Sequence, residues 1–190
     1  MSGSVSGIEN SRVNLAYLPQ AADIDRSFPI DLFDLAAMGL WRRCGAFGAY
    51  THADKNQIRD AISAIGLSGF ETRRISTLSG GQMQRALFAR LLLQDAPVIL
   101  LDEPFAAVDT RTVDALLALI ANWHAEGRTV VAVLHDIDLV RAHFPQTLLM
   151  AREAVAWGDT RDVLSIENLS AARAMNEAFD PHARECEGAA

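Results

Sequence analysis

The stretch Val98-Ile99-Leu100-Leu101-Asp102-Glu103-Pro104 decides how the sequence is interpreted, because four apolar residues run directly into two acids. A short apolar run of this kind is typical of a strand buried in a parallel sheet. Ligands of parallel sheets bind beyond the carboxyl ends of the strands, where Asp102 and Glu103 would lie. We expect Asp102 to hold Mg²⁺ through water and Glu103 to orient a water molecule that attacks a phosphate. The alternative is that both acids only begin the following turn.

The segments around this strand alternate between the patterns of helices and strands. Such alternation predicts an α/β fold with a parallel sheet and helices on its faces. Strands are expected at 13–18, 98–101, 129–134, 147–150 and 154–157, and helices at 81–94, 110–125, 161–164 and 167–179.

A glycine-rich turn, Leu78-Ser79-Gly80-Gly81-Gln82, opens the helix before the acidic strand. Two glycines let the backbone approach a ligand closely. Because the free N–H groups at the start of a helix bind anions, phosphate is the expected ligand. The competing interpretation is an ordinary loop in which Ser79 caps the helix.

Further polar residues follow the other strands. Gln20 follows the strand at 13–18, Asp109 ends the Phe105-Ala106-Ala107-Val108-Asp109 segment, and His135 follows the strand at 129–134. A neutral histidine there can hydrogen-bond a phosphate oxygen or the attacking water, although a lone histidine more often has a packing role. We expect these groups to lie on one edge of the sheet.

The domain organisation is expected to be one partial domain over 1–190, which the resemblance described below makes an ATP-binding domain. Apolar residues at helical spacing predict a small helical subdomain at 29–78. The sheet core would then comprise 1–28 and 79–165, followed by a C-terminal helix and tail at 166–190.

The composition excludes several classes of protein. The net charge of −7 and the absence of a basic cluster argue against nucleic-acid binding. Cys44 and Cys186 form no pattern of a metal site or disulfide framework. No apolar run approaches the roughly 20 residues of a membrane span.

Taken together, these motifs resemble the nucleotide-binding subunits of ABC transporters, over nearly the whole chain. Leu78–Gln82 matches the signature sequence, and Val98–Glu103 matches the Walker B strand with its catalytic glutamate. Ala107–Asp109 resembles the D-loop, His135 the switch histidine and Gln20 the Q-loop glutamine. The implied fold is a P-loop NTPase-like, RecA-like parallel core with an inserted helical subdomain.

The resemblance also implies cofactors and a composite site. ATP and Mg²⁺ would be bound, with Gln20 joining Asp102 at the metal. Two subunits would form a homodimer in which Ser79, Gly81 and Gln82 contact the γ-phosphate held by the partner subunit. Asp109 would then lie at the dimer interface. Gln20 would relay occupancy of the metal site to transmembrane permease subunits docked on the helical subdomain.

A finer resemblance concerns the transported substrate. Tyr17-Leu18-Pro19-Gln20, 24–29 and Met38-Gly39-Leu40 are similar to the zinc and manganese importers. The chain would then sit peripherally on the cytoplasmic face of the membrane. It would work indirectly with a periplasmic or extracellular metal-binding protein.

One departure from the family puts activity in doubt. No Gly-Lys-Ser or Gly-Lys-Thr loop occurs, and the single lysine, Lys55, follows Ala-Asp. Ser2-Gly3-Ser4-Val5 resembles the stretch after the phosphate-loop helix, so an N-terminal block is expected to be missing. A truncated gene product, a misassigned start codon and an incomplete sequence are the possible origins. Without that block, the sheet would expose apolar surface.

Three functions therefore stay open. The first is an ATPase subunit that energises import of a transition metal but is inactive by itself. The second is a non-catalytic regulatory or interaction fragment. The third, a soluble ABC ATPase, is disfavoured because no coiled-coil insertion, second cassette or basic surface occurs.

Overall fold

The computed structural model describes residues 14–20, 24–45 and 48–177. The expected start of the first strand at Val13, the stretch Ser2–Val5 and the tail from 178 lie outside the described residues. The chain forms two compact units, residues 1–133 and 134–190, and each is described by itself.

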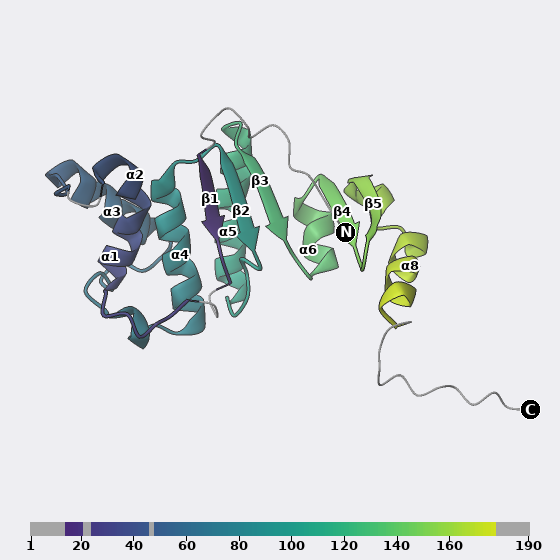
Figure 1. Cartoon of the computed structure of the whole chain (residues 1–190), viewed down its shortest axis with the longest axis horizontal. Coiled ribbons are helices and arrows are strands. Elements are labelled where there is room, and N and C mark those ends of the chain that lie inside the picture. Colours follow the sequence, from purple (N-terminus) through teal and green to yellow (C-terminus); the bar gives the residue numbers. More distant parts are fainter. Residues whose placement is uncertain (1–13, 21–23, 46–47, 178–190) are drawn as a thin grey trace, which may run out of the picture. The chain divides into compact units, whose positions relative to one another are not determined.

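A three-stranded parallel sheet forms the centre of the first unit (Figure 1). Its strands, in spatial order, are β1 (Leu15–Leu18), β2 (Val98–Asp102) and β3 (Thr129–Val133). In the register, Leu18 pairs with Leu101 and Asp102 with Val133. The sequence-based prediction of an α/β fold with a parallel sheet is therefore confirmed.

One face of this sheet is covered by two helices. Every second residue of β1 and β2 points to that face and is at most 1% exposed. These residues are Ala16, Leu18, Ile99 and Leu101. Helix α4 (Gly80–Gln94) packs on β1 and α5 (Thr110–Ala125) packs on β3. The rings of Phe88 on α4 and Trp123 on α5 stack with centroids 6.4 Å apart, so both helices share this face. Burial of each such large side chain contributes about 1.5–3 kcal/mol.

The opposite face carries exposed apolar side chains. Leu15, Tyr17, Val131 and Val133 are 42%, 45%, 52% and 53% exposed. The reason is topological. The connections from β1 to β2 and from β2 to β3 advance in one direction, and right-handed crossovers then place their helices on one side. Exposed apolar surface was expected for a sheet without a phosphate-loop helix.

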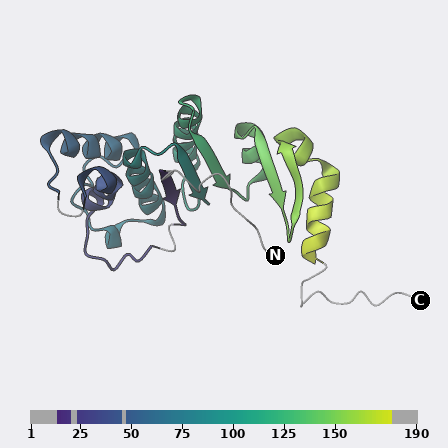
Figure 2. The same ribbon diagram turned by 45° about the horizontal axis from the view of Figure 1, so that its top comes forward.

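Short helices pack on the other side of α4 (Figure 2). They are α1 (Leu32–Ala37), η2 (Met38–Leu40) and α3 (His52–Ala64). The short helix α2 (Trp41–Cys44) contacts η2, and η3 (Ile75–Thr77) precedes the glycine-rich turn. Apolar residues at helical spacing between Leu32 and Leu40 predict one helix, but the α-helix gives way to a 3-10 turn at Met38. There the chain approaches α4 so closely that a Cβ on Gly39 would lie 2.3 Å from the Arg90 carbonyl oxygen.

The second unit contains an antiparallel pair, β4 (Gln146–Met150) and β5 (Ala154–Asp159). Its helices are α6 (Ile137–His143), α7 (Thr160–Val163) and α8 (Ile166–Glu177). Helix α6 was not predicted from the sequence. Within the described ranges of the chain, no helix has the length and apolar character that crossing a membrane requires.

Asp109 caps α5, and this cap makes stability depend on pH. The Thr112 backbone N–H and hydroxyl donate to the Asp109 carboxylate at 3.0 and 2.8 Å. These bonds are the main cause that lowers the pKa of Asp109 below 3.8. A lowered pKa in the folded state gives stability that is present above the unfolded pKa and lost as the pH falls through the folded pKa.

We therefore expect Asp109→Asn to unfold more easily than the parent at pH 7, with a difference that shrinks as the pH falls below about 4. Urea unfolding across pH 7 to 3 measures this difference. Asp114→Asn on the same helix is the matched control, because it removes the same charge without altering the cap. Equal pH profiles for the two variants would contradict the assignment.

Candidate functional site

Three of the expected site residues lie at the carboxyl edge of the first unit's sheet. Asp102 is the last residue of β2, Glu103 follows it, and Gln20 lies two residues beyond β1. Because Leu18 and Leu101 are in register, Gln20 and the acid pair leave the sheet at the same level. All three side chains belong to half-buried residues. This edge therefore gathers one amide and two carboxyl groups.

Tyr17 also belongs to this edge, and sequence reasoning did not assign it a role. Its hydroxyl donates to Oδ2 of Asp102 at 3.3 Å, which joins β1 to β2 beside the acid pair. Tyr17 alternates onto the exposed face of the sheet, and this alternation, together with its place three residues before Gln20, was the signal that could have found it. The hydrogen bond holds the Asp102 carboxylate in one orientation.

The backbone at Glu103 adopts a conformation that is unusual for a non-glycine residue. Its φ is 44°, in the left-handed region, and Ala107 in the same loop has a φ of 58°. The Glu103 N–H donates to the Val133 carbonyl at 3.2 Å, and the Glu103 carbonyl accepts from the Ala106 N–H at 3.1 Å. Such conformations cost about 1–3 kcal/mol each and persist only where the surroundings hold them.

The glycine-rich turn caps its own helix. Ser79 is the N-cap of α4: its Oγ accepts from the Gln82 N–H at 3.2 Å, and the Gln82 side chain accepts from the Ser79 N–H at 2.9 Å. Leu78 is 4% exposed, and its carbonyl accepts from Arg26 at 3.2 Å. The capping interpretation is therefore correct for the chain by itself. Because the Ser79 oxygen acts as an acceptor there, its O–H proton can still be donated to an anion.

The two glycines of this turn lie against the loop that follows Glu103. A Cβ on Gly81 would come within 2.7 Å of the Ala107 carbonyl oxygen, and one on Gly80 within 3.4 Å of the Ala107 Cβ. Any larger residue at position 81 would push this loop away. Gly81 thus permits the close contact between the start of α4 and the segment leading to Asp109.

Gln84 is a second link between α4 and this loop, and it was missed from the sequence. Its side chain is fully buried at 0% exposure, and Nε2 donates to the Pro104 carbonyl at 3.0 Å. Gln84 Oε1 is buried without a hydrogen-bond partner among the described residues. A glutamine on the apolar stripe that includes Leu87, Phe88 and Leu91 was the signal that could have found it.

His135 follows β3 by two residues along the chain and belongs to the second unit. The first unit brings together Gln20, Asp102 and Glu103, whereas the place of His135 at that edge stays a prediction.

The donor set at the edge suits some cofactor groups better than others. Carboxylate and amide oxygens are what Mg²⁺ prefers, so Asp102 and Gln20 fit this ion. A phosphate cradle with a lysine is missing from the 190 residues, and Lys55 lies in α3. Among the residues that the structure describes, no group of three or more His, Cys, Asp or Glu side chains could hold a metal.

Comparisons with known proteins agree with this geometry. Residues 2–106 match the ABC transporter family. The chain is 37% identical over 161 residues to the manganese transport system ATP-binding protein MntB of Bacillus subtilis, which covers 85% of this chain and 64% of the relative. It is 37% identical to the zinc transport system ATP-binding protein TroB of Treponema pallidum, covering 77% of this chain and 55% of the relative. The chain thus spans less than two thirds of the length of these relatives.

Two solved structures share the fold. One, described as a metal-chelate type ABC transporter in an inward-facing conformation, has a TM-score of 0.74 and 30% identity over 84% of this chain and 63% of that one. The other, a dimeric ATP-binding cassette bound to ADP and phosphate, has a TM-score of 0.67 and 25% identity over 79% of this chain and 64% of that one. The family match and the related proteins show that this chain belongs to the ABC transporter family and forms part of its ATP-binding domain.

Proposed function

We propose that this chain is the larger part of an ATP-binding subunit that energises transport of a transition metal ion across a membrane. The observation that carries the proposal is the convergence of Gln20, Asp102 and Glu103 at one edge of a parallel sheet. Manganese or zinc is the proposed substrate, since the relatives named above serve transport of those metals. The metal would pass through other subunits, and this chain would supply the driving force.

Each edge residue has a distinct proposed role. Asp102 would hold Mg²⁺ through water, with Gln20 as a second oxygen donor, and the ion would neutralise charge on the phosphates when bound. Glu103 would orient the attacking water and accept its proton. His135 would donate a hydrogen bond to a phosphate oxygen or accept one from the water.

Other copies and subunits would complete the site. Ser79, Gly80, Gly81 and Gln82 of a second copy would present the α4 N-terminus to the γ-phosphate, and Asp109 would lie at the interface between the copies. Transmembrane permease subunits would dock on the helical subdomain proposed at 29–78. The subunit would sit on the cytoplasmic face of the membrane and work indirectly with an external metal-binding protein. A phosphate-binding loop would have to come from polypeptide other than these 190 residues.

The missing phosphate-binding loop favours a second candidate, a non-catalytic regulatory fragment. Such a fragment would associate with a permease subunit and would bind no ATP by itself. A pull-down with the permease combined with an ATP-binding assay on the isolated chain separates the two candidates.

Glu103→Gln tests the proposed chemistry in a subunit that includes a phosphate-binding loop and is assembled with its permease. We expect Mg²⁺-dependent ATP turnover to fall by about 10²–10⁴-fold, because the amide cannot accept a proton, while ATP binding is retained. Glu153→Gln, on an exposed residue of the second unit, is the matched control. Full turnover in Glu103→Gln would remove Glu103 from its role.

The loop that carries Glu103 should depend on Gln84. Gln84→Leu leaves the Pro104 carbonyl without its buried donor, so we expect a loss of about 1–3 kcal/mol in the free energy of unfolding. Hydrogen exchange of the 103–107 amides should also rise, because the loop loses an anchor.

The control is Gln94→Leu, which replaces another side chain whose buried Oε1 is unsatisfied among the described residues. Since this change removes an unpaired oxygen, it should be neutral or stabilising. If the two leucine variants lose equal stability and leave exchange at 103–107 unchanged, Gln84 does not anchor this loop.

A further inference from the structure

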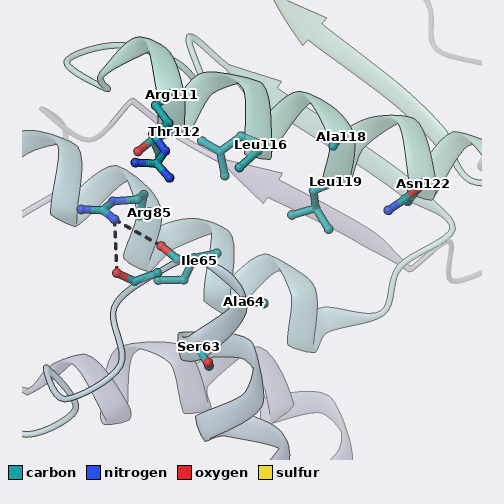
Figure 3. A pocket seen from close by; sticks show the side chains of 12 residues that line it. Ser63, Ala64, Ile65, Arg85, Arg111, Thr112, Leu116, Ala118, Leu119 and Asn122 are labelled. Atoms are coloured by element: carbon teal, nitrogen blue, oxygen red, sulfur yellow. Dashed lines mark hydrogen bonds between the residues drawn. The ribbon is translucent and has the colours of Figure 1, made fainter.

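A cavity away from the sheet edge lies between α4, α5 and the turn that ends α3 (Figure 3). Its volume of about 450 Å³ is within the range of small-molecule sites. Its apolar lining comes from two sides, with Ala64 and Ile65 on one and Ala115, Leu116 and Leu119 on the other. The cavity can therefore take an apolar body of modest size.

The charge of this lining has one sign. Arg85 and Arg111 are its charged members, and no Asp or Glu of the described part of the chain lines it, although the whole chain has a net charge of −7. Figure 3 shows Arg85 and Arg111 at one end of the cavity, with Leu119 and Asn122 toward the other end. An anionic group bound at this end would be attracted by both positive charges.

Arg85 is held in place from one side. Its Nη1 donates to the Ile65 and Gly66 carbonyls at 3.4 and 3.3 Å, which are long bonds. The guanidinium has five N–H donors, so this anchoring leaves others for a ligand. Arg111 lines the cavity from α5 and is exposed, so its guanidinium is accessible to an anion.

The cavity also adjoins the cap of α5. Thr112 lines it and donates to Asp109, and the charge of Arg85 is among the weaker causes that lower the pKa of Asp109. An anion bound at Arg85 would compete with Asp109 for the charge of this guanidinium. Binding in the cavity would therefore weaken the electrostatic stabilisation of the Asp109 carboxylate at the start of α5.

We propose that this cavity is a binding site for a small organic carboxylate, with its anionic group between Arg85 and Arg111 and its apolar body against Leu116 and Leu119. This inference does not depend on the proposed ATPase activity, because every residue it uses lies outside the edge formed by Gln20, Asp102 and Glu103.

Hexanoate is the probe, titrated into the ¹⁵N-labelled chain and followed by NMR. The expected result is saturable shifts at Arg111, Thr112 and Leu119, with much weaker binding of acetate, which lacks the apolar body, and of 1-hexanol, which lacks the charge. Arg111→Gln should weaken hexanoate binding by about tenfold or more, as expected when a charged hydrogen bond is lost.

Arg173→Gln, an exposed change of the same charge on α8, is the matched control and should bind hexanoate like the parent. Leu119→Ala tests the apolar half and should weaken hexanoate while leaving acetate unchanged. Equal hexanoate affinity in the parent and Arg111→Gln would overturn the proposal. So would shifts confined to the exposed sheet face at Val131 and Val133.

Discussion

The candidate site depends on the parallel pairing of β2 with a neighbour on each side. This pairing sets Leu18 beside Leu101 and Asp102 beside Val133, so the polar residues after each strand leave the sheet at one level. A shift of one residue would turn Asp102 to the opposite face and Leu101 out of the core. The buried positions Ala16, Leu18, Ile99 and Leu101 oppose such a shift, because moving them to solvent would cost several kcal/mol. The apolar core and the polar edge are therefore two consequences of one register.

Helix α4 stabilises the second element of the site, the loop from Glu103 to Asp109. This loop contains two non-glycine residues with positive φ, and it would relax without support. Gln84 anchors it at the Pro104 carbonyl, and Gly81 lets α4 approach at Ala107. The same helix begins with the Ser79 cap. The first turns of α4 thus join the Ser79 cap to the backbone that carries the acid pair, within one chain.

Local signals in the sequence predicted much of this structure. The bounds of α5 were predicted as observed, because Asp109 is a strong N-cap and Gly127 follows the end of the helix. The strand before Asp102 was predicted because its apolar run and terminal acids are local features. Helix α6 was missed, since its seven residues are too few to show a helical period and bury no side chain among those described.

Contacts between distant residues could not be predicted in this way. The break of the first helix near Gly39 depends on the Arg90 carbonyl, and the bonds of Tyr17 to Asp102 and of Gln84 to Pro104 join residues 85 and 20 positions apart. The pattern and spacing of residues along the sequence do not predict such long-range contacts. The motifs predicted a candidate site at particular strand ends, and this remains a prediction. The contacts of Tyr17 and Gln84 that hold those strand ends became visible only in the fold.

The most direct measurement is a structure of two copies of the subunit, complete with a phosphate-binding loop, bound to Mg²⁺ and a non-hydrolysable ATP analogue. The account predicts one ion within water-bridged reach of Asp102 and beside Gln20, Glu103 facing the γ-phosphate, and Ser79 of the second copy donating to that phosphate. An ion bound elsewhere, or Gln20 and Asp102 directed to opposite sides of the sheet, would contradict it.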